Sequence, residues 1–92
     1  MAIGALNIGN YKQLAASANV KSGQGAMLGI FVSAATATPT ITIYDDAAAG
    51  TTTKIVDVFT PVASTWYPLP YGFTNGLNVV FGGTVSATVS YV

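Results

Sequence analysis

The chain has 92 residues, a formal net charge of zero and only 7% charged residues, with no histidine, cysteine, arginine or glutamate. General acid–base catalysis, nucleophile activation and thiolate metal binding draw mainly on those missing side chains, so the composition argues against an enzyme and against a bound cofactor or metal. Three lysines without arginine cannot neutralise a phosphate backbone, which argues against direct binding to nucleic acid.

The length fits one domain, but a domain of this size buries only about 60–65% of its unfolded surface. Without cysteine there are no disulfides to add stability, which favours oligomerisation or a partner surface. The longest apolar run, residues 26–37, is too short for a helix that crosses a bilayer, so we expect no membrane partner. Residues 1–12 have no basic region ahead of an apolar stretch and no compact cleavage pattern of small residues after one, so a signal peptide is not expected, which favours synthesis in a cytoplasm.

The chain reads as strands separated by turns from beginning to end. Residues 1–10 are apolar but interrupted by glycine, which favours a first strand and leaves an extended N-terminal arm as the alternative. Further strands are predicted at 12–20, 26–34, 39–45, 53–60, 65–71, 77–81 and 84–92. Prolines make residues 60–71 irregular or an edge strand. The predicted fold is all-β: a single-domain antiparallel β-sandwich over residues 1–92, jelly-roll-like, with about seven to eight strands.

Two segments carry a clear period of two. In residues 39–45, Ile41 and Ile43 alternate with threonine and tyrosine, and residues 84–92 repeat this pattern with valine, alanine and tyrosine against threonine and serine. Alternation of this kind predicts one buried and one exposed face. The predicted core is Leu28, Ile30, Val32, Ile41, Ile43, Leu77, Val79, Val85, Val89 and Tyr91.

The order of motifs over residues 25–92 is similar to that in a class of small tailed-bacteriophage virion proteins. The similarity consists of Gly-x-x-x-x-Ile at residues 25–30, ITIYDD at 41–46, WYPLPYGFTNGLNVVFGG at 66–83 and a terminal TVSYV. Its most specific part is the segment LPYGFTNGL at 69–77, which in that class precedes the last two strands. The resemblance implies a jelly-roll or β-sandwich capsid decoration (cement) protein, and it carries no catalytic residues.

The expected function is therefore structural and not enzymatic. The chain is expected to bind the major capsid protein on the capsid surface of a virion, after synthesis in the host cytoplasm, and to stabilise the head lattice without a cofactor. A homo-oligomer is expected, with a trimer at lattice threefold positions as one form. Two alternatives remain: a tail, neck or fibre component, and a carbohydrate-binding β-sandwich module that uses Trp66 and Tyr71.

The candidate contact residues are aromatic or apolar. Tyr67, Tyr71 and Phe73 lie in the segment rich in proline, and Ile3 and Leu6 lie in the N-terminal segment. We expect Trp66 to be buried at one end of the sandwich, with at least one tyrosine at an interface.

The acidic pair Asp45–Asp46 follows a predicted strand. This position favours a turn in which the carboxylates bond nearby backbone, and a calcium site is the alternative.

Overall fold

The computed structural model describes residues 9–92, which form one antiparallel sheet of six strands with no helix. The strands are β1 (Asn10–Leu14), β2 (Ala18–Ser22), β3 (Gly25–Tyr44), β4 (Lys54–Phe59), β5 (Thr65–Phe73) and β6 (Gly76–Tyr91). The all-β prediction is confirmed. The expectations for Ile3 and Leu6 lie outside the described residues, as do positions 1–8 of the first strand or arm predicted at residues 1–10.

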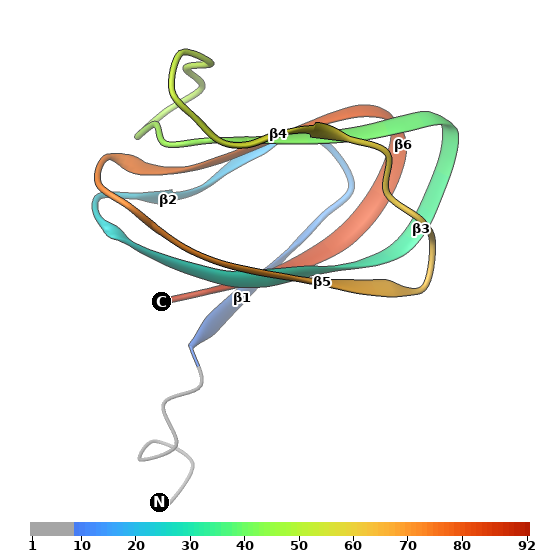
Figure 1. The fold of residues 1–92 in the computed structure, drawn as a ribbon, viewed down its shortest axis with the longest axis horizontal. Coiled ribbons are helices and arrows are strands. Elements are labelled where there is room, and N and C mark those ends of the chain that lie inside the picture. Colours follow the sequence, from blue (N-terminus) through green and yellow to red (C-terminus); the bar gives the residue numbers. More distant parts are fainter. Residues whose placement is uncertain (1–8) are drawn as a thin grey trace, which may run out of the picture.

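The two long strands, β3 and β6, pair with each other along almost their whole length. The register runs from Met27 opposite Tyr91 to Tyr44 opposite Asn78. The first part of β3 also pairs with β5 and its last part with β4, whereas β2 pairs with the first part of β6 and β1 with its last part. Both long strands curve round at the same end of the molecule (Figure 1), so each contributes to two runs of neighbouring strands.

Unusual backbone conformations mark this curve. The ladder between β3 and β6 is interrupted after Thr36, and Ala37 and Thr38 have φ angles of 58° and 54°, in the left-handed region that side chains disfavour. Across from them Gly83 has a φ of 68°, and a side chain there would collide with the carbonyl oxygens of both residues. The strands predicted at 26–34 and 39–45 are therefore one strand with a corner in it.

Buried apolar side chains from both halves of the long strands form a single core. Eight of the ten predicted core residues are 0–1% exposed: Ile30, Val32, Ile41, Ile43, Leu77, Val79, Val85 and Val89. Tyr91 packs partly buried against this cluster. The core also contains residues outside the prediction: Leu14, Val20, Met27, Phe73 and Ala87.

The prediction for Leu28 is wrong, and a bulge explains the error. The pairing of β3 with both neighbours shifts between Met27 and Gly29, which adds one residue to the alternation. Met27 therefore points into the core and is fully buried, whereas Leu28 is 36% exposed. Beyond the bulge the predicted register holds, with Ile30 buried.

The single strand predicted at 12–20 is two strands, because its two halves pair with different parts of β6. The prediction of an edge strand is confirmed for β5, which contains Pro68 and Pro70 and, within residues 9–92, pairs with β3 alone. No helix in residues 9–92 has the length and hydropathy needed to span a membrane.

Candidate interaction surface

One face of the sheet carries exposed apolar and aromatic side chains from three strands. Trp66 on β5 lies directly opposite Phe31 on β3, and they are 47% and 41% exposed. The preceding residue, Ile30, is fully buried in the core. Because successive side chains of a strand point to opposite faces, Phe31 points away from the core. Leu28 and, on β1, Tyr11 are also exposed. We call the surface formed by Tyr11, Leu28, Phe31 and Trp66 the open face.

The indole ring of Trp66 packs against the sheet in the space that Gly29, which has no side chain, leaves open. A Cβ atom on Gly29 would lie 2.5 Å from the indole of Trp66, so the ring occupies the space that any other residue at this position would fill. Gly29 is buried beneath it, yet about half of the Trp66 side chain stays exposed. A large aromatic ring that packs on the sheet on one side and is exposed on the other can bind a partner with little loss of conformational entropy.

Small uncharged polar residues surround these rings. On β6, Thr88 lies opposite Phe31, and Ser90 lies between Tyr11 and Gly29 in the next row. An aromatic centre with a rim of hydroxyl groups and few charges is typical of protein interfaces. The open face therefore has the composition of a docking surface.

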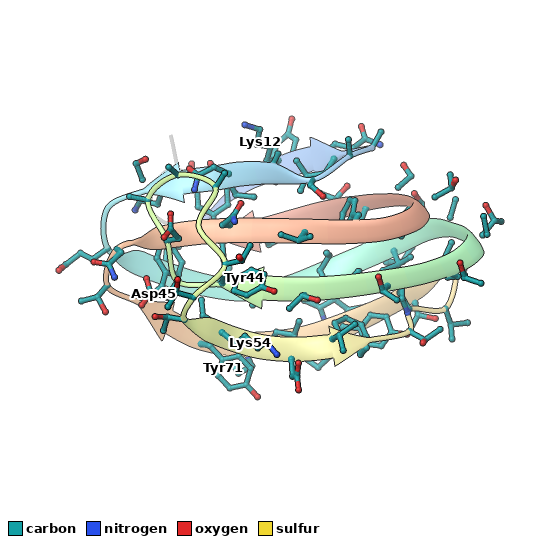
Figure 2. All side chains as sticks on the ribbon, turned by 90° about the horizontal axis from the view of Figure 1, so that it is seen from above. Lys12, Tyr44, Asp45, Lys54 and Tyr71 are labelled. Carbon is teal, nitrogen blue, oxygen red and sulfur yellow. The ribbon has the colours of Figure 1, made fainter. Side chains whose placement is uncertain are left out.

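The six charged residues of the chain lie elsewhere. Lys12 is on β1, Lys21 on β2, and Lys54 and Asp57 are on β4, which are all strands at the sides of the sheet, and the two other aspartates follow β3. Figure 2 shows Lys12 and Lys54 at opposite edges of the sheet. Charges on edge strands discourage the addition of a further strand, and Pro68 and Pro70 do the same on β5. Charges and prolines thus oppose the addition of a further strand at the edges, whereas no charged residue among positions 9–92 lies on the open face.

Residues 45–53, which we call the covering loop, lie over one end of the surface formed by β2, β4 and the adjoining parts of β3 and β6. Asn19 donates from Nδ2 to the carbonyl oxygens of Asp46 and Ala48, at 3.0 and 2.8 Å. Asn78 donates to the carbonyl oxygen of Gly50 at 3.0 Å and is only 3% exposed. Figure 1 shows this loop rising above the strands between β3 and β4.

The two aspartates that begin the covering loop bind backbone N–H groups. Asp46 Oδ1 accepts from the amides of Ala48 and Gly50, at 2.8 and 3.0 Å. Asp45 accepts from the turn between β5 and β6, which is 29–31 residues away in sequence. The prediction of a turn is confirmed, and one of the two carboxylates also joins distant segments.

The Asp45 carboxylate accepts hydrogen bonds from three successive backbone N–H groups. The N–H of Thr74 donates to its oxygens at 3.0 and 3.2 Å, that of Asn75 at 2.7 Å and that of Gly76 at 3.1 Å, and the Thr74 hydroxyl adds a bond at 3.2 Å. The amide of Thr74 and then that of Asn75 are the main causes that hold the pKa of Asp45 below its ordinary value, with a smaller contribution from Gly76. The carboxylate is therefore ionised in the folded protein at neutral pH.

An open hollow of about 420 Å³ lies beside this turn. Its lining is Gln24, Gly25, Gly72, Phe73 and Thr74. None of these side chains can serve as a general base or as an activated nucleophile on its own. The hollow does not bring catalytic groups together.

Tyr67, one of the predicted contact residues, makes several contacts within the chain. Its hydroxyl accepts a hydrogen bond from the backbone N–H of Val62 at 2.9 Å, and its ring lies 5.2 Å from that of Phe59 at an angle of 56°. The side chain packs partly buried against the core. It holds the connection between β4 and β5 in place.

The other aromatic predictions have different outcomes. Phe73 is 5% exposed and belongs to the core, so little of it is open to a partner, and its role as a contact residue stays a prediction. Tyr71 is 46% exposed, opposite Met27 and away from the pair formed by Trp66 and Phe31. The predicted burial of Trp66 is also wrong.

A signal for these positions was present in the sequence. Tyr67 and Leu69 have the same parity in β5 and pack against the core, which assigns Trp66 to the opposite side. Phe31 and Tyr11 were not predicted as surface residues. Phe31 has the parity opposite to Ile30 and Val32, so the alternation could have identified it.

Comparison of the chain with protein-family models, with curated proteins and with solved structures finds no match. The observations that bear on function are therefore the geometry of the open face and the motifs at residues 25–92.

Proposed function

We propose that the chain is a structural virion protein that decorates a capsid and stabilises its lattice by docking through the open face. The observation that carries this proposal is a fixed, half-exposed Trp66 beside an exposed Phe31 on a face with small polar neighbours. The arrangement suits permanent attachment better than chemistry, because it offers apolar area and no reactive group. The motifs at residues 25–92 support the assignment to tailed-bacteriophage virions.

We also propose that the sheet is folded into two layers in the strand order of a jelly roll. One layer would contain β5, the first part of β3, the last part of β6 and β1, in that order, and the other β4, the last part of β3, the first part of β6 and β2. The strand pairings and the corner at Ala37, Thr38 and Gly83 support this arrangement. Viral capsid and lectin domains use this architecture.

Docking through such a face needs little desolvation of charge. A capsid subunit that meets Trp66 and Phe31 gains from burial of apolar area, so binding should depend only weakly on salt. A copy that contacts two or more subunits adds interface that must be lost before they separate. Many weakly bound copies, or a homo-oligomer such as a trimer, would strengthen attachment through effective concentration.

The guarded edges favour face-on docking over strand addition. A partner strand beside β4 would meet Lys54 and Asp57, which already form an exposed ion pair at 2.8 Å, and one beside β5 would meet two prolines. The proposed partner is accordingly an uncharged surface of the major capsid protein.

The test is co-sedimentation of the purified chain with particles that lack it. The double variant Trp66→Ser/Phe31→Ser should lower the bound fraction at a given concentration by about tenfold or more, as loss of central aromatic contacts does. The matched control, Val58→Ser/Val62→Ser, removes two exposed apolar side chains outside the open face and should bind as the wild type does. If the Trp66→Ser/Phe31→Ser variant also binds as the wild type does, the open face is not the docking surface.

Mass spectrometry of purified particles tests the location. A copy number close to that of the shell protein supports a head decoration role, whereas a few copies would place the chain in a tail, neck or fibre.

A carbohydrate-binding module is the second candidate, because Trp66 is exposed where we expected burial. A fixed indole flanked by hydroxyl groups also suits stacking on a neutral sugar ring. A glycan array separates the two candidates: a wild-type signal that Trp66→Ser abolishes would favour the module, and no signal together with co-sedimentation would discard it.

A further inference from the structure

The turn between β5 and β6 contains the dipeptide Asn75–Gly76, the one Asn–Gly pair in the sequence. In such a pair the backbone nitrogen of glycine can attack the asparagine side chain with little steric hindrance, because glycine has no Cβ. The Asn75 side chain is exposed to solvent. The other asparagines, at positions 7, 10, 19 and 78, are followed by isoleucine, tyrosine or valine, whose side chains hinder the same attack.

The peptide groups on both sides of Asn75 are held in place. Its own N–H donates to Asp45 Oδ1 at 2.7 Å, and the N–H of Gly76 donates to the same oxygen at 3.1 Å. The carbonyl oxygen of Asn75 accepts from the N–H of Gly23 at 2.8 Å. The nitrogen that would act as the nucleophile is thus bonded to a carboxylate of another segment.

We propose that Asn75 is the deamidation site of this chain and that Asp45 suppresses the reaction in the folded protein. The Gly76 nitrogen loses its proton and forms a bond to Cγ of Asn75, and the side-chain nitrogen leaves as ammonia, which gives a five-membered succinimide. Water then opens the ring at one of its two carbonyl groups, and the product is aspartate or isoaspartate. No oxidant or reductant takes part.

Asp45 opposes the first step in two ways. Its negative charge lies beside the nitrogen that must become an anion, which disfavours loss of the proton. Its hydrogen bonds also fix the Gly76 peptide plane, so the nitrogen can rotate towards the Asn75 side chain only when the turn opens. The reaction rate should then follow the population of the open turn, as amide hydrogen exchange does.

Both products would weaken the contact that protected the site. Aspartate at position 75 adds a second negative charge next to Asp45, and like charges at short range repel. Isoaspartate lengthens the backbone by one atom between positions 75 and 76, so the amides of Asn75 and Gly76 can no longer converge on one oxygen. Each reacted molecule would keep the turn open, which makes the change irreversible in structure as well as in covalent chemistry.

The experiment is peptide mapping by mass spectrometry during incubation in mildly alkaline buffer. Asp45→Ala should convert Asn75 about tenfold faster than the wild type, because the turn opens more often once its hydrogen bonds to a charged group are lost. Asp57→Asn, which removes an exposed carboxylate on β4, is the matched control and should convert Asn75 at the wild-type rate. Asn75→Gln should show no conversion at position 75, because glutamine would have to close a larger ring.

A second comparison needs no variant, and it decides the matter if Asp45→Ala does not fold. The wild-type chain unfolded in guanidinium chloride should convert Asn75 about tenfold faster than the native chain. Equal rates in the native and unfolded chains would overturn the proposal. So would slower conversion in a folded Asp45→Ala protein, since Asp45 would then act as a base for the attack. Because the assay contains no particles, its outcome is independent of the proposed capsid role.

Discussion

Two outward-facing regions of this sheet both contain parts of the two long strands, yet they differ in what lies over them. On one, the covering loop at residues 45–53 is tied down by Asn19 and Asn78, and polar groups beneath it are buried. On the other, Trp66 and Phe31 remain exposed beside small hydroxyl side chains. The covering loop is bonded to the strands beneath it by buried or half-buried amides, whereas the open face presents two adjacent aromatic rings to a partner.

The largest effect should come from the core that both faces share. Ile43 is fully buried on β3, so Ile43→Asp places an unpaired charge among apolar side chains and should cost several kcal/mol, enough to abolish cooperative folding. Circular dichroism during heating measures this. Val58→Asp, at an exposed position on an edge strand, is the control and should melt close to the wild type. Unchanged melting of Ile43→Asp would show that the core register is wrong.

The covered face should depend on Asn78. Asn78→Ala leaves the carbonyl oxygen of Gly50 without its donor, and a lost buried hydrogen bond of this kind costs about 1–3 kcal/mol. We expect a lower melting temperature together with faster hydrogen exchange in residues 45–53. Asn10→Ala, at an exposed asparagine on β1, should change neither quantity. Unaltered exchange in the loop of Asn78→Ala would mean that other contacts hold it.

The open face should depend on Gly29. In Gly29→Ala the new methyl group would press on the indole of Trp66 and on the backbone of Tyr67, an overpacking that costs about 1–3 kcal/mol. Since Trp66 is the single tryptophan, its fluorescence should shift towards longer wavelength as the ring moves into water. Gly72→Ala is the control, because a Cβ there meets ordinary contacts only. An unshifted spectrum would contradict the placement of the ring over Gly29.

The smallest effect should be the pH dependence of the Asp45 contact. Folding lowers the pKa of Asp45 from 3.8, so its ionised form adds stability above that value, and the contribution disappears as the pH falls through the lower pKa of the folded state. The melting temperature should therefore fall in this acidic range, and less so in Asp45→Asn. Asp57→Asn removes a carboxylate whose pKa is also lowered, mainly by Lys54, but this exposed pair should matter little. Identical pH profiles for the wild type and Asp45→Asn would contradict the assignment.

The alternation of apolar and polar residues predicted the core positions of the regular strand segments. Ile41, Ile43, Val85 and Val89 could be assigned to the core because strict alternation follows from strand geometry. Leu28 could not, since one extra residue at a bulge reverses the pattern without a change in composition.

The functional surface was harder to predict for a different reason. Trp66 was expected to be buried at one end of the sandwich, whereas its ring lies over Gly29, which is 37 positions earlier and on another strand. The partners of Asp45 are equally remote, and no spacing rule connects an aspartate to amides about 30 residues further on. Contacts of this kind become visible only when the strand pairing is known.

The place of β6 in the sheet has a consequence for how the protein is made. This strand is the last of the six along the chain, yet β1, β2 and β3 all pair with it. During translation those three strands leave the ribosome without their partner, with backbone groups and apolar side chains open to other nascent chains. Folding must therefore wait until β6 has been synthesised, and a truncation that removes it should leave no stable subdomain.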